Sequence, residues 1–238
     1  MIRADGRKYD ESRPVEITTG FIRFAEGSAL IRCGDTVVLC NASVEDRVPP
    51  HVRPGCGWVT AEYSMLPRAN RERSRRDVDK LKLSGRSAEI QRLIGRSLRA
   101  AVDMRRLGER TITIDCDVLQ GDGGTRTASV TGGFVALSLA LHKLVMDGVL
   151  PEMPLTNCVA AVSAGIVGDE LLLDLCYEED SSAQVDLNCV MTGAGELVEL
   201  QGTGEGRPFT IVEQRALVEL CAKGIRELQN IQRQVLGG

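Results

Sequence analysis

The alternation of apolar and polar residues predicts that the first third of the chain is β-structure. Alternating runs of strand length cover residues 15–18, 21–24, 29–32, 36–39 and 58–65. Residues 25–28 and 33–35 separate three of these runs and contain glycine and aspartate, which tolerate the positive φ of tight turns. We therefore expect a series of strands joined by hairpins.

A helical period follows these strands. Ser87 is a residue type typical of an N-cap, and Gly108 stands where a glycine commonly ends a helix. The pattern predicts one helix between them, because apolar residues recur three or four positions apart at Ile90, Leu93, Ile94, Leu98, Ala101 and Met104.

Strict alternation then returns and leads into a glycine-rich turn. One face of the predicted strand is formed by Ile112, Ile114, Cys116 and Val118. The turn covers residues 120–126, and a long, mostly apolar helix is expected from about residue 129 to 146.

The last third of the chain repeats this order of elements. Strands are expected near 159–167, 170–177, 185–191 and 197–202, followed by a helix over about 210–235. Because strands are followed by helices in both halves, we predict two αβ units, residues 1–150 and 151–238.

Composition narrows the class of protein. The chain has 238 residues, enough for one large domain or two small intertwined ones. Aromatic residues make up only 3%, which argues against an RNA-binding module built on aromatic stacking. The net charge is −4, yet residues 68–76 hold five arginines against one glutamate. The distribution of charge therefore matters more than its sum.

The cysteines and the apolar segments indicate a cytoplasmic protein with no membrane segment. The eight cysteines contain no C-x-x-C pair and the two histidines lie apart, so zinc-site spacing is absent. We expect the cysteines to be small buried hydrophobes. The N-terminus lacks the apolar core of a signal peptide, and the apolar stretch 130–146 is too short and interrupted to cross a bilayer.

The glycine-rich turn is a candidate anion site. Gly124 lets backbone N–H groups approach an anion, Thr125 adds a hydroxyl donor, and Arg126 adds a guanidinium fork. No lysine follows the last glycine, so the turn is not a nucleoside-triphosphate P-loop. The alternative is a turn that serves chain geometry alone.

Arginines supply two further candidates. Arg86 stands just ahead of a helix start, where the helix dipole disfavours a cation unless an anion is bound beside it. The alternative is an ordinary surface arginine. The second candidate is an RNA-backbone contact through Arg68, Arg71, Arg73, Arg75 and Arg76, with a solvated charged face as the alternative.

Acidic residues gather in the last third, at Asp174, Asp180 and Asp186. Asp186 shares a strand face with Asn188, because side chains two positions apart point the same way. Asp180 and Asp186 could together hold Mg²⁺ through a few oxygens, completed by water and a substrate phosphate. The alternative is a solvated acidic hairpin.

Four stretches of the chain resemble the ribonuclease PH family: residues 3–7 (RADGR), 60–69 (TAEYSMLPRA), 89–99 (EIQRLIGRSLR) and 123–129 (GGTRTAS). The resemblance implies an α+β fold of duplicated βαβ units of the ribosomal protein S5 domain 2-like type, with mixed sheets and packed helices. It also implies a homo-hexamer built as a trimer of dimers. The chain departs from the family pattern at Gly121, at Ser87-Ala88 and at 70–73, which bears on substrate preference.

The activity implied by the resemblance is Mg²⁺-assisted phosphorolysis of the 3′ end of tRNA precursors and other structured RNA. Inorganic phosphate is the co-substrate, nucleoside diphosphates are released, and the reverse nucleotidyl addition is possible. By the same resemblance Asp180 and Asp186 are the catalytic and metal carboxylates. Arg86 and the turn Gly124, Thr125 and Arg126 are the phosphate site, and the five arginines at 68–76 are the tRNA contact.

The composition agrees with such a reaction. Inorganic phosphate is already charged near neutral pH, so it needs no side chain to deprotonate it, and neither histidine lies beside the acidic segment. Two rival functions remain. One is a non-catalytic RNA-binding ring subunit of the exosome type, and the other is a hydrolytic nuclease with a metal-activated water.

Overall fold

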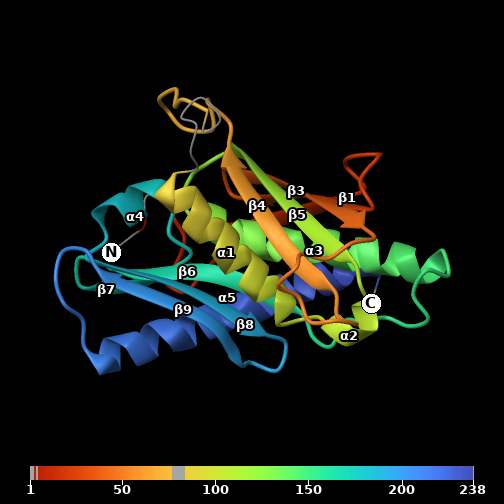
Figure 1. The fold of residues 1–238 in the computed structure, drawn as a ribbon. Helices are drawn as coiled ribbons and strands as arrows, with labels where there is room; N and C mark the ends of the chain where they lie inside the picture. Colours follow the sequence, from red (N-terminus) through yellow and green to blue (C-terminus); the bar gives the residue numbers. More distant parts are fainter. Residues whose placement is uncertain (1–2, 4, 77–83, 238) are drawn as a thin grey trace.

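The computed structural model describes residues 3, 5–76 and 84–237 (Figure 1). In chain order the elements are β1 (Val15–Thr19), β2 (Gly27–Cys33), β3 (Thr36–Glu45), β4 (Trp58–Met65), α1 (Gly85–Arg99), α2 (Met104–Leu107), β5 (Thr111–Gln120), α3 (Thr125–Met146), β6 (Val159–Val167), β7 (Glu170–Leu173), α4 (Tyr177–Ser182), β8 (Val185–Thr192), β9 (Leu197–Gly204) and α5 (Ile211–Leu236).

The first sheet is mixed and has the strand order β1-β2-β3-β5-β4. Neighbouring strands of this sheet are antiparallel, except for β4 and β5. These two run parallel and are connected through α1 in a βαβ unit. Helix α1 packs on β4, while α3 packs on β2, β3 and β5 and touches α1. One face of this sheet is therefore covered by two helices lying side by side.

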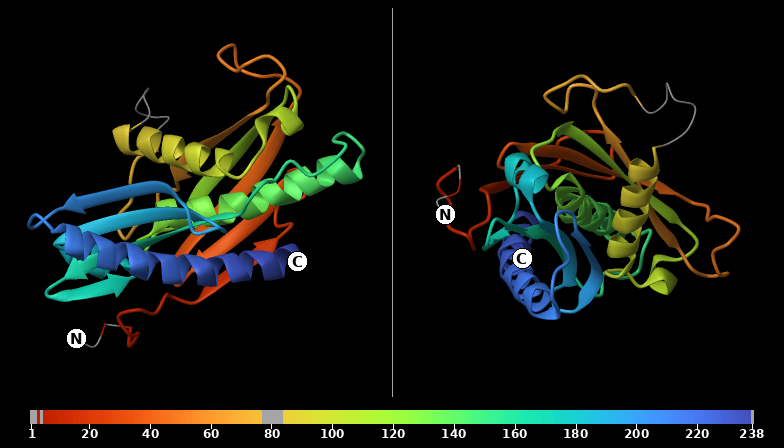
Figure 2. Two further views of the ribbon diagram at one scale, coloured as in Figure 1. Left: turned by 90° about the horizontal axis from the view of Figure 1, so that it is seen from below. Right: turned by 90° about the vertical axis from the view of Figure 1, so that its left-hand side faces the viewer.

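The second sheet has the strand order β7-β6-β8-β9 and is antiparallel in each of these pairings. Helix α5 covers it by packing on β6, β7 and β8, and it also reaches β1. Helix α3 contacts β6 as well as the first sheet, so it lies between the two sheets (Figure 2). The predicted α+β class, with sheets and packed helices, is confirmed.

Helix α3 is the core helix of the molecule. By length and composition alone it is apolar enough to cross a membrane, but 72% of its most apolar window is buried inside the protein. Its buried residues include Val130, Phe134 and Leu137, and the helix as a whole packs against both sheets. Burial within a folded interior explains its apolar composition without a bilayer.

Several sequence predictions about local structure are wrong. Residues 21–24 form a turn rather than a strand, and Phe24 is 87% exposed, so the apolar alternation there does not reflect burial. The predicted helix 87–108 is two helices, since Asp103 caps a new helix, α2, through its side chain. The N-cap of α1 is Ser84, whose hydroxyl accepts from the amide of Ser87.

The predicted strand at 170–177 also ends early, at Leu173. Asp174 follows with a φ of 52°, a left-handed conformation that breaks the strand, and α4 begins at Tyr177. All eight cysteines are free, and the prediction that they are buried is confirmed for five of them, namely Cys33, Cys40, Cys116, Cys189 and Cys221. Cys56, Cys158 and Cys176 are only partly buried.

Candidate functional site

The glycine-rich turn leads directly into the N-terminus of α3. The helix begins at Thr125, four residues earlier than the apolar pattern indicates, with Gly124 as a left-handed N-cap at a φ of 62°. The first N–H groups of a helix have no intrahelical acceptor and carry the positive end of its dipole. The turn thus presents backbone donors together with the side chains of Thr125 and Arg126, as an anion site requires.

The turn is packed against the segment that precedes the acidic helix α4. Gly123 has a φ of 73°, and a Cβ at this position would lie 2.5 Å from the carbonyl oxygen of Leu175. The amide of Tyr177 donates to Oδ1 of Asp122 at 3.3 Å. Because glycine allows this close approach, the glycine-rich turn and the segment before α4 are neighbours in space.

Arg13 fastens the two segments together. Its Nε and Nη2 donate to the two carboxylate oxygens of Asp174 at 2.9 and 2.7 Å, and its Nη1 donates to the backbone carbonyl of Asp122. Both Arg13 and Asp174 are buried. A buried, bidentate pair of this kind is strong and geometrically specific. Asp174 therefore has a structural role, in contrast to the two carboxylates that follow it.

Asp186, on β8, is a half-buried carboxylate with one oxygen that has no hydrogen bond to a described residue. Nδ2 of Asn188 donates to its Oδ2 at 3.0 Å, while Oδ1 is buried and has no hydrogen-bond partner among the described residues. Burial, followed by repulsion from Asp180, raises the pKa of Asp186 to about 6. A buried acceptor left without a donor and a neighbouring like charge both favour the binding of a cation.

Asp180 lies on the exposed side of α4 and completes a pair of carboxylates with Asp186. Loss of hydration raises its pKa, whereas the charges of Arg86 and Arg126 lower it in part. In residues 3, 5–76 and 84–237, no group of three or more His, Cys, Asp or Glu side chains could hold a metal ion. Two carboxylates fit Mg²⁺, which keeps several waters and takes further oxygens from substrate phosphate.

The two arginines that were predicted for a phosphate site approach this pair from separate helices. Arg86 is exposed in the first turn of α1, and Arg126 is in the first turn of α3 with 18% of its side chain exposed. Both charges act on Asp180 and on Tyr63, whose hydroxyl is hydrogen-bonded to Oγ1 of Thr125 at 2.8 Å. The structure therefore brings the turn, both arginines and both carboxylates to one place.

The five arginines at 68–76 lie on the exposed loop that follows β4. The carbonyl of Ala69 accepts from the amide of Gly121 at 2.8 Å, so the base of this loop touches the glycine-rich turn. Nη2 of Arg71 donates to Glu178 on α4 at 3.0 Å. Arg68, Arg73, Arg75 and Arg76 are exposed, and residues 77–83, which follow them, lie outside the described residues.

Some site residues carry no obvious sequence signal. Gln201 on β9 accepts a hydrogen bond from Arg126. Arg13, near the start of the chain, joins the turn at Asp122 to the acidic segment at Asp174. Tyr63 reaches Thr125 from β4. The Asn188 contact could be found, because its spacing of two from Asp186 on a strand places both on one face.

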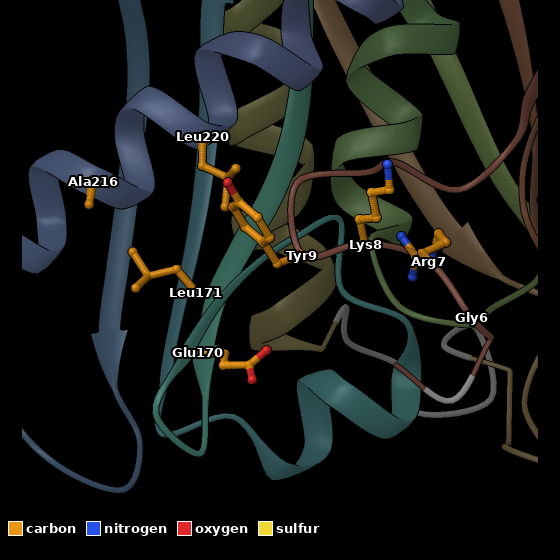
Figure 3. A pocket seen from close by; sticks show the side chains of 8 residues that line it. All are labelled: Gly6, Arg7, Lys8, Tyr9, Glu170, Leu171, Ala216 and Leu220. Carbon is orange, nitrogen blue, oxygen red and sulfur yellow. The ribbon is translucent and has the colours of Figure 1, made fainter. Parts of the chain in front are cut away.

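A cavity lies apart from this cluster of charged residues, between the N-terminal segment, β7 and α5 (Figure 3). It has a volume of about 760 Å³ and is lined by residues that include Arg7, Tyr9, Leu171 and Leu220. It contains none of the site residues predicted from the sequence. We place the chemistry at the charged cluster, because the cavity lacks paired carboxylates and a helix N-terminus.

Comparisons with known proteins agree across the chain. Residues 11–142 match the family model described as "3' exoribonuclease family, domain 1", and residues 157–218 match "3' exoribonuclease family, domain 2". The chain is 59% identical over 238 residues to the ribonuclease PH of Moorella thermoacetica, covering 100% of this chain and 95% of that protein. It is 57% identical to the ribonuclease PH of Bacillus subtilis, covering 99% and 97%.

Solved structures give the same picture. A chain of the Archaeoglobus fulgidus exosome with RNA bound to the active site aligns with a TM-score of 0.83 and 26% identity, over 96% of this chain and 91% of that one. A chain of an archaeal exosome core aligns with a TM-score of 0.75 and 25% identity, over 98% and 90%.

Proposed function

The chain belongs to the 3′ exoribonuclease family, and we propose that it shortens tRNA precursors from the 3′ end by phosphorolysis. The observation that carries the proposal is the meeting of an anion-binding helix N-terminus at Thr125 with the carboxylates of Asp180 and Asp186. A donor-rich turn beside paired carboxylates suits a reaction in which two phosphate groups and a metal ion come together.

In this proposal the turn and the arginines bind the attacking phosphate. Backbone N–H groups at Thr125 and the guanidinium groups of Arg86 and Arg126 hold inorganic phosphate in line with the terminal phosphodiester. An oxygen of HPO₄²⁻ bonds to the terminal phosphorus as the bond from phosphorus to O3′ breaks. The proton of the hydrogen phosphate passes to the new 3′-hydroxyl, and a nucleoside diphosphate leaves. The reverse steps add a nucleotide.

The reaction needs no histidine base. His51 packs edge-on against Trp58, and Nδ1 of His142 is hydrogen-bonded within α3 to the carbonyl of Ser138. Positioning and charge stabilisation are therefore the tasks of the protein groups.

The carboxylates of Asp180 and Asp186 would hold Mg²⁺. The buried oxygen Oδ1 of Asp186, which lacks a hydrogen bond to any described residue, fits a metal ligand. When bound, Mg²⁺ supplies positive charge that offsets the negative charge of the phosphates. The hydrogen bond from Asn188 to Oδ2 fixes the orientation of the Asp186 carboxylate and would leave Oδ1 for the metal ion.

The RNA substrate would be held by the exposed arginines that follow β4. Arg68, Arg73, Arg75 and Arg76, with Arg71, offer phosphate contacts beside the turn, because Ala69 is hydrogen-bonded to Gly121. The likeness to exosome chains supports an assembly of several copies, and we infer a homo-hexamer built as a trimer of dimers. Free cysteines support a reducing compartment, which we infer to be the cytoplasm.

One assay tests this proposal against its rivals. The purified chain is incubated with a 3′-extended tRNA and Mg²⁺, either with inorganic phosphate or in a phosphate-free buffer. Nucleoside diphosphates that form only with phosphate support phosphorolysis. Nucleoside monophosphates that form without phosphate would identify a hydrolytic nuclease, and the absence of any product would identify an RNA-binding subunit of the exosome type.

A further inference from the structure

Gln201 lies between the phosphate-site arginine and a carboxylate. Its Oε1 accepts a hydrogen bond from Nη1 of Arg126 at 2.8 Å, and its Nε2 donates to Oε1 of Glu89 at 2.6 Å. Oε1 of Glu89 is also 3.8 Å from Nη1 of Arg126. The three side chains therefore form a closed triangle in which every contact fits the chemistry of its partners.

The triangle fixes which way the Gln201 amide points. Its oxygen must face the guanidinium, which only donates, and its nitrogen must face the carboxylate, which only accepts. A flipped amide would lose both hydrogen bonds. It would place its NH₂ against the N–H groups of Arg126 and its oxygen against the carboxylate of Glu89. Arg126 thus has an acceptor with one defined position, and its long side chain is held in a narrow set of rotamers.

Such a restraint is needed at this position. Arg126 is in the first turn of α3, where the positive end of the helix dipole repels a guanidinium. Without an acceptor on the far side, the side chain would swing away from the helix end and from the anion site. The oxygen of Gln201 and the charge of Glu89 offset that repulsion.

The three residues come from different elements: Glu89 from α1, Arg126 from α3 and Gln201 from β9. A second bridge joins two of these elements, since Arg96 on α1 donates to both oxygens of Glu199 on β9 at 3.0 and 3.1 Å. Glu199 and Gln201 are two positions apart on one strand and share its face. Only the bridge through Gln201 touches Arg126.

We propose that Gln201 and Glu89 are positioning residues that aim the guanidinium of Arg126 at the inorganic phosphate co-substrate. The inference rests on the proposed phosphorolytic function. It assigns to β9, in the second half of the chain, a part in binding the attacking phosphate at a turn that belongs to the first half. RNA binding is not expected to depend on the triangle.

The test compares two substitutions on the same strand face. Gln201→Met keeps the length of the side chain and removes both hydrogen bonds, whereas Glu199→Met removes the neighbouring bridge between α1 and β9 and leaves Arg126 untouched. Initial rates of nucleoside diphosphate release are measured on the full chain over a range of phosphate concentrations, with 3′-extended tRNA and Mg²⁺ fixed. The unfolding temperature of each variant is recorded alongside.

We expect Gln201→Met to raise the KM for phosphate about tenfold and to change the KM for RNA by less than about twofold, since an arginine that is present but misdirected loses charge-assisted contacts. Glu199→Met should leave the phosphate KM within about twofold of wild type. Glu89→Gln removes the charge beside Arg126 but keeps an oxygen that accepts from Nε2 of Gln201, so its phosphate KM should rise less than that of Gln201→Met. Adding Gln201→Met to Arg126→Ala should have no further effect on phosphate KM.

Two results would overturn the inference. One is a phosphate KM that is unchanged in Gln201→Met, and the other is an equal rise in Glu199→Met, which would mean that contact between α1 and β9 is all that matters. Either result, with phosphate-dependent release intact in the wild-type chain, would leave the proposed function standing. Release from the wild-type chain that needs no phosphate would overturn the function and this inference together.

Discussion

The side-chain amide of Asn188 holds one oxygen of Asp186 and leaves the other free. Nδ2 of Asn188 donates to Oδ2 at 3.0 Å, from two positions along β8, and Oδ1 is buried without a hydrogen-bond partner among the residues that the structure describes. Burial and then the nearby Asp180 raise the pKa of this carboxyl to about 6. The carboxylate is oriented but incompletely stabilised, which gives several measurable consequences.

The first consequence concerns Asp186→Asn. Turnover should be abolished at every Mg²⁺ concentration, because the variant loses the charge that would hold the metal. In metal-free buffer at about pH 8 the variant should nevertheless unfold at a higher temperature than wild type, since the fold disfavours the ionised carboxylate. Calorimetry and the release assay measure both effects. Near-normal activity would reassign Asp186 to a structural role.

The sign of the stability effect follows from the direction of the pKa shift. The folded pKa of Asp186 is about 6 and its ordinary value is 3.8, so the folded state binds this proton more tightly than the unfolded chain does. Between these two values the contribution of Asp186 to stability falls as pH rises. The advantage of Asp186→Asn should therefore shrink as pH is lowered from about 6 toward about 4.

The second consequence is a pH-dependent affinity for Mg²⁺. Metal ligands must be deprotonated, so the affinity of the wild-type chain should weaken as pH falls through about 6. Titration calorimetry at about pH 8 and about pH 5 should show a loss of about tenfold. Asp180→Asn removes the like charge that helps to raise the pKa of Asp186, so in metal-free buffer the titration midpoint of the Asp186 carboxyl should move down in that variant. An affinity that does not vary with pH would contradict the assignment.

Much of this architecture is open to prediction from the sequence. Periodicity predicts β4, β5, α3 and α5, and the turn before α3 stands out because glycines cluster between a strand and a helix. The run at 21–24 is mispredicted because residue type alone cannot show that Phe24 faces solvent. The strand at 170–177 is overextended because its end depends on Asp174, which is held by Arg13.

The contacts that assemble the site are the part that the sequence does not reveal. Arg13 and Asp174 are 161 positions apart, and Arg126 and Gln201 are 75 apart. A polar residue on an alternating strand looks the same whether it faces water or an active-site arginine. Family resemblance supplies candidate roles for Arg126 and Asp186, and the fold adds the hydrogen bonds that Gln201 and Asn188 make to them.

A third prediction concerns Arg126→Ala. The KM for phosphate should rise sharply, by about a hundredfold, because a charged group that contacts the co-substrate is lost. Binding of tRNA should remain close to wild type, since we assign that affinity to the exposed arginines at 68–76. Fluorescence anisotropy with labelled tRNA and phosphate-dependent rates separate the two effects. Arg105→Ala, on the exposed face of α2, is a control of equal charge.

A fourth prediction concerns the turn itself. Gly123→Ala should lower the unfolding free energy by more than about 1 kcal/mol, because its φ of 73° is unfavourable for alanine and its Cβ would meet the carbonyl of Leu175. Phosphorolysis should fall with it, since the turn would move away from the acidic segment. Gly121→Ala is the matched control, as its Cβ would meet the flexible end of Met65 at 3.2 Å. If urea denaturation showed the same loss of unfolding free energy for Gly123→Ala and Gly121→Ala, the packing argument would be contradicted.

A fifth prediction concerns the exposed arginines after β4. Replacing Arg73 and Arg75 together by alanine should weaken tRNA binding and flatten its dependence on salt by about two units of the log–log slope. The phosphate KM should stay unchanged. Replacing Arg105 and Arg106 on α2 makes the same change in net charge elsewhere on the surface. If the two double variants bound tRNA alike, overall charge would explain the affinity.

Helix α3 supplies interior surface to both sheets, and Gln232 of α5 donates to the carbonyls of Thr131 on α3 and Val159 on β6. Neither sheet can open without exposing the same helix, so we expect the subunit to melt in a single transition. For an enzyme that acts on RNA ends, single-transition unfolding means that RNA binding and cleavage are lost together. We therefore expect no stable, half-unfolded subunit that binds RNA but cannot cleave it.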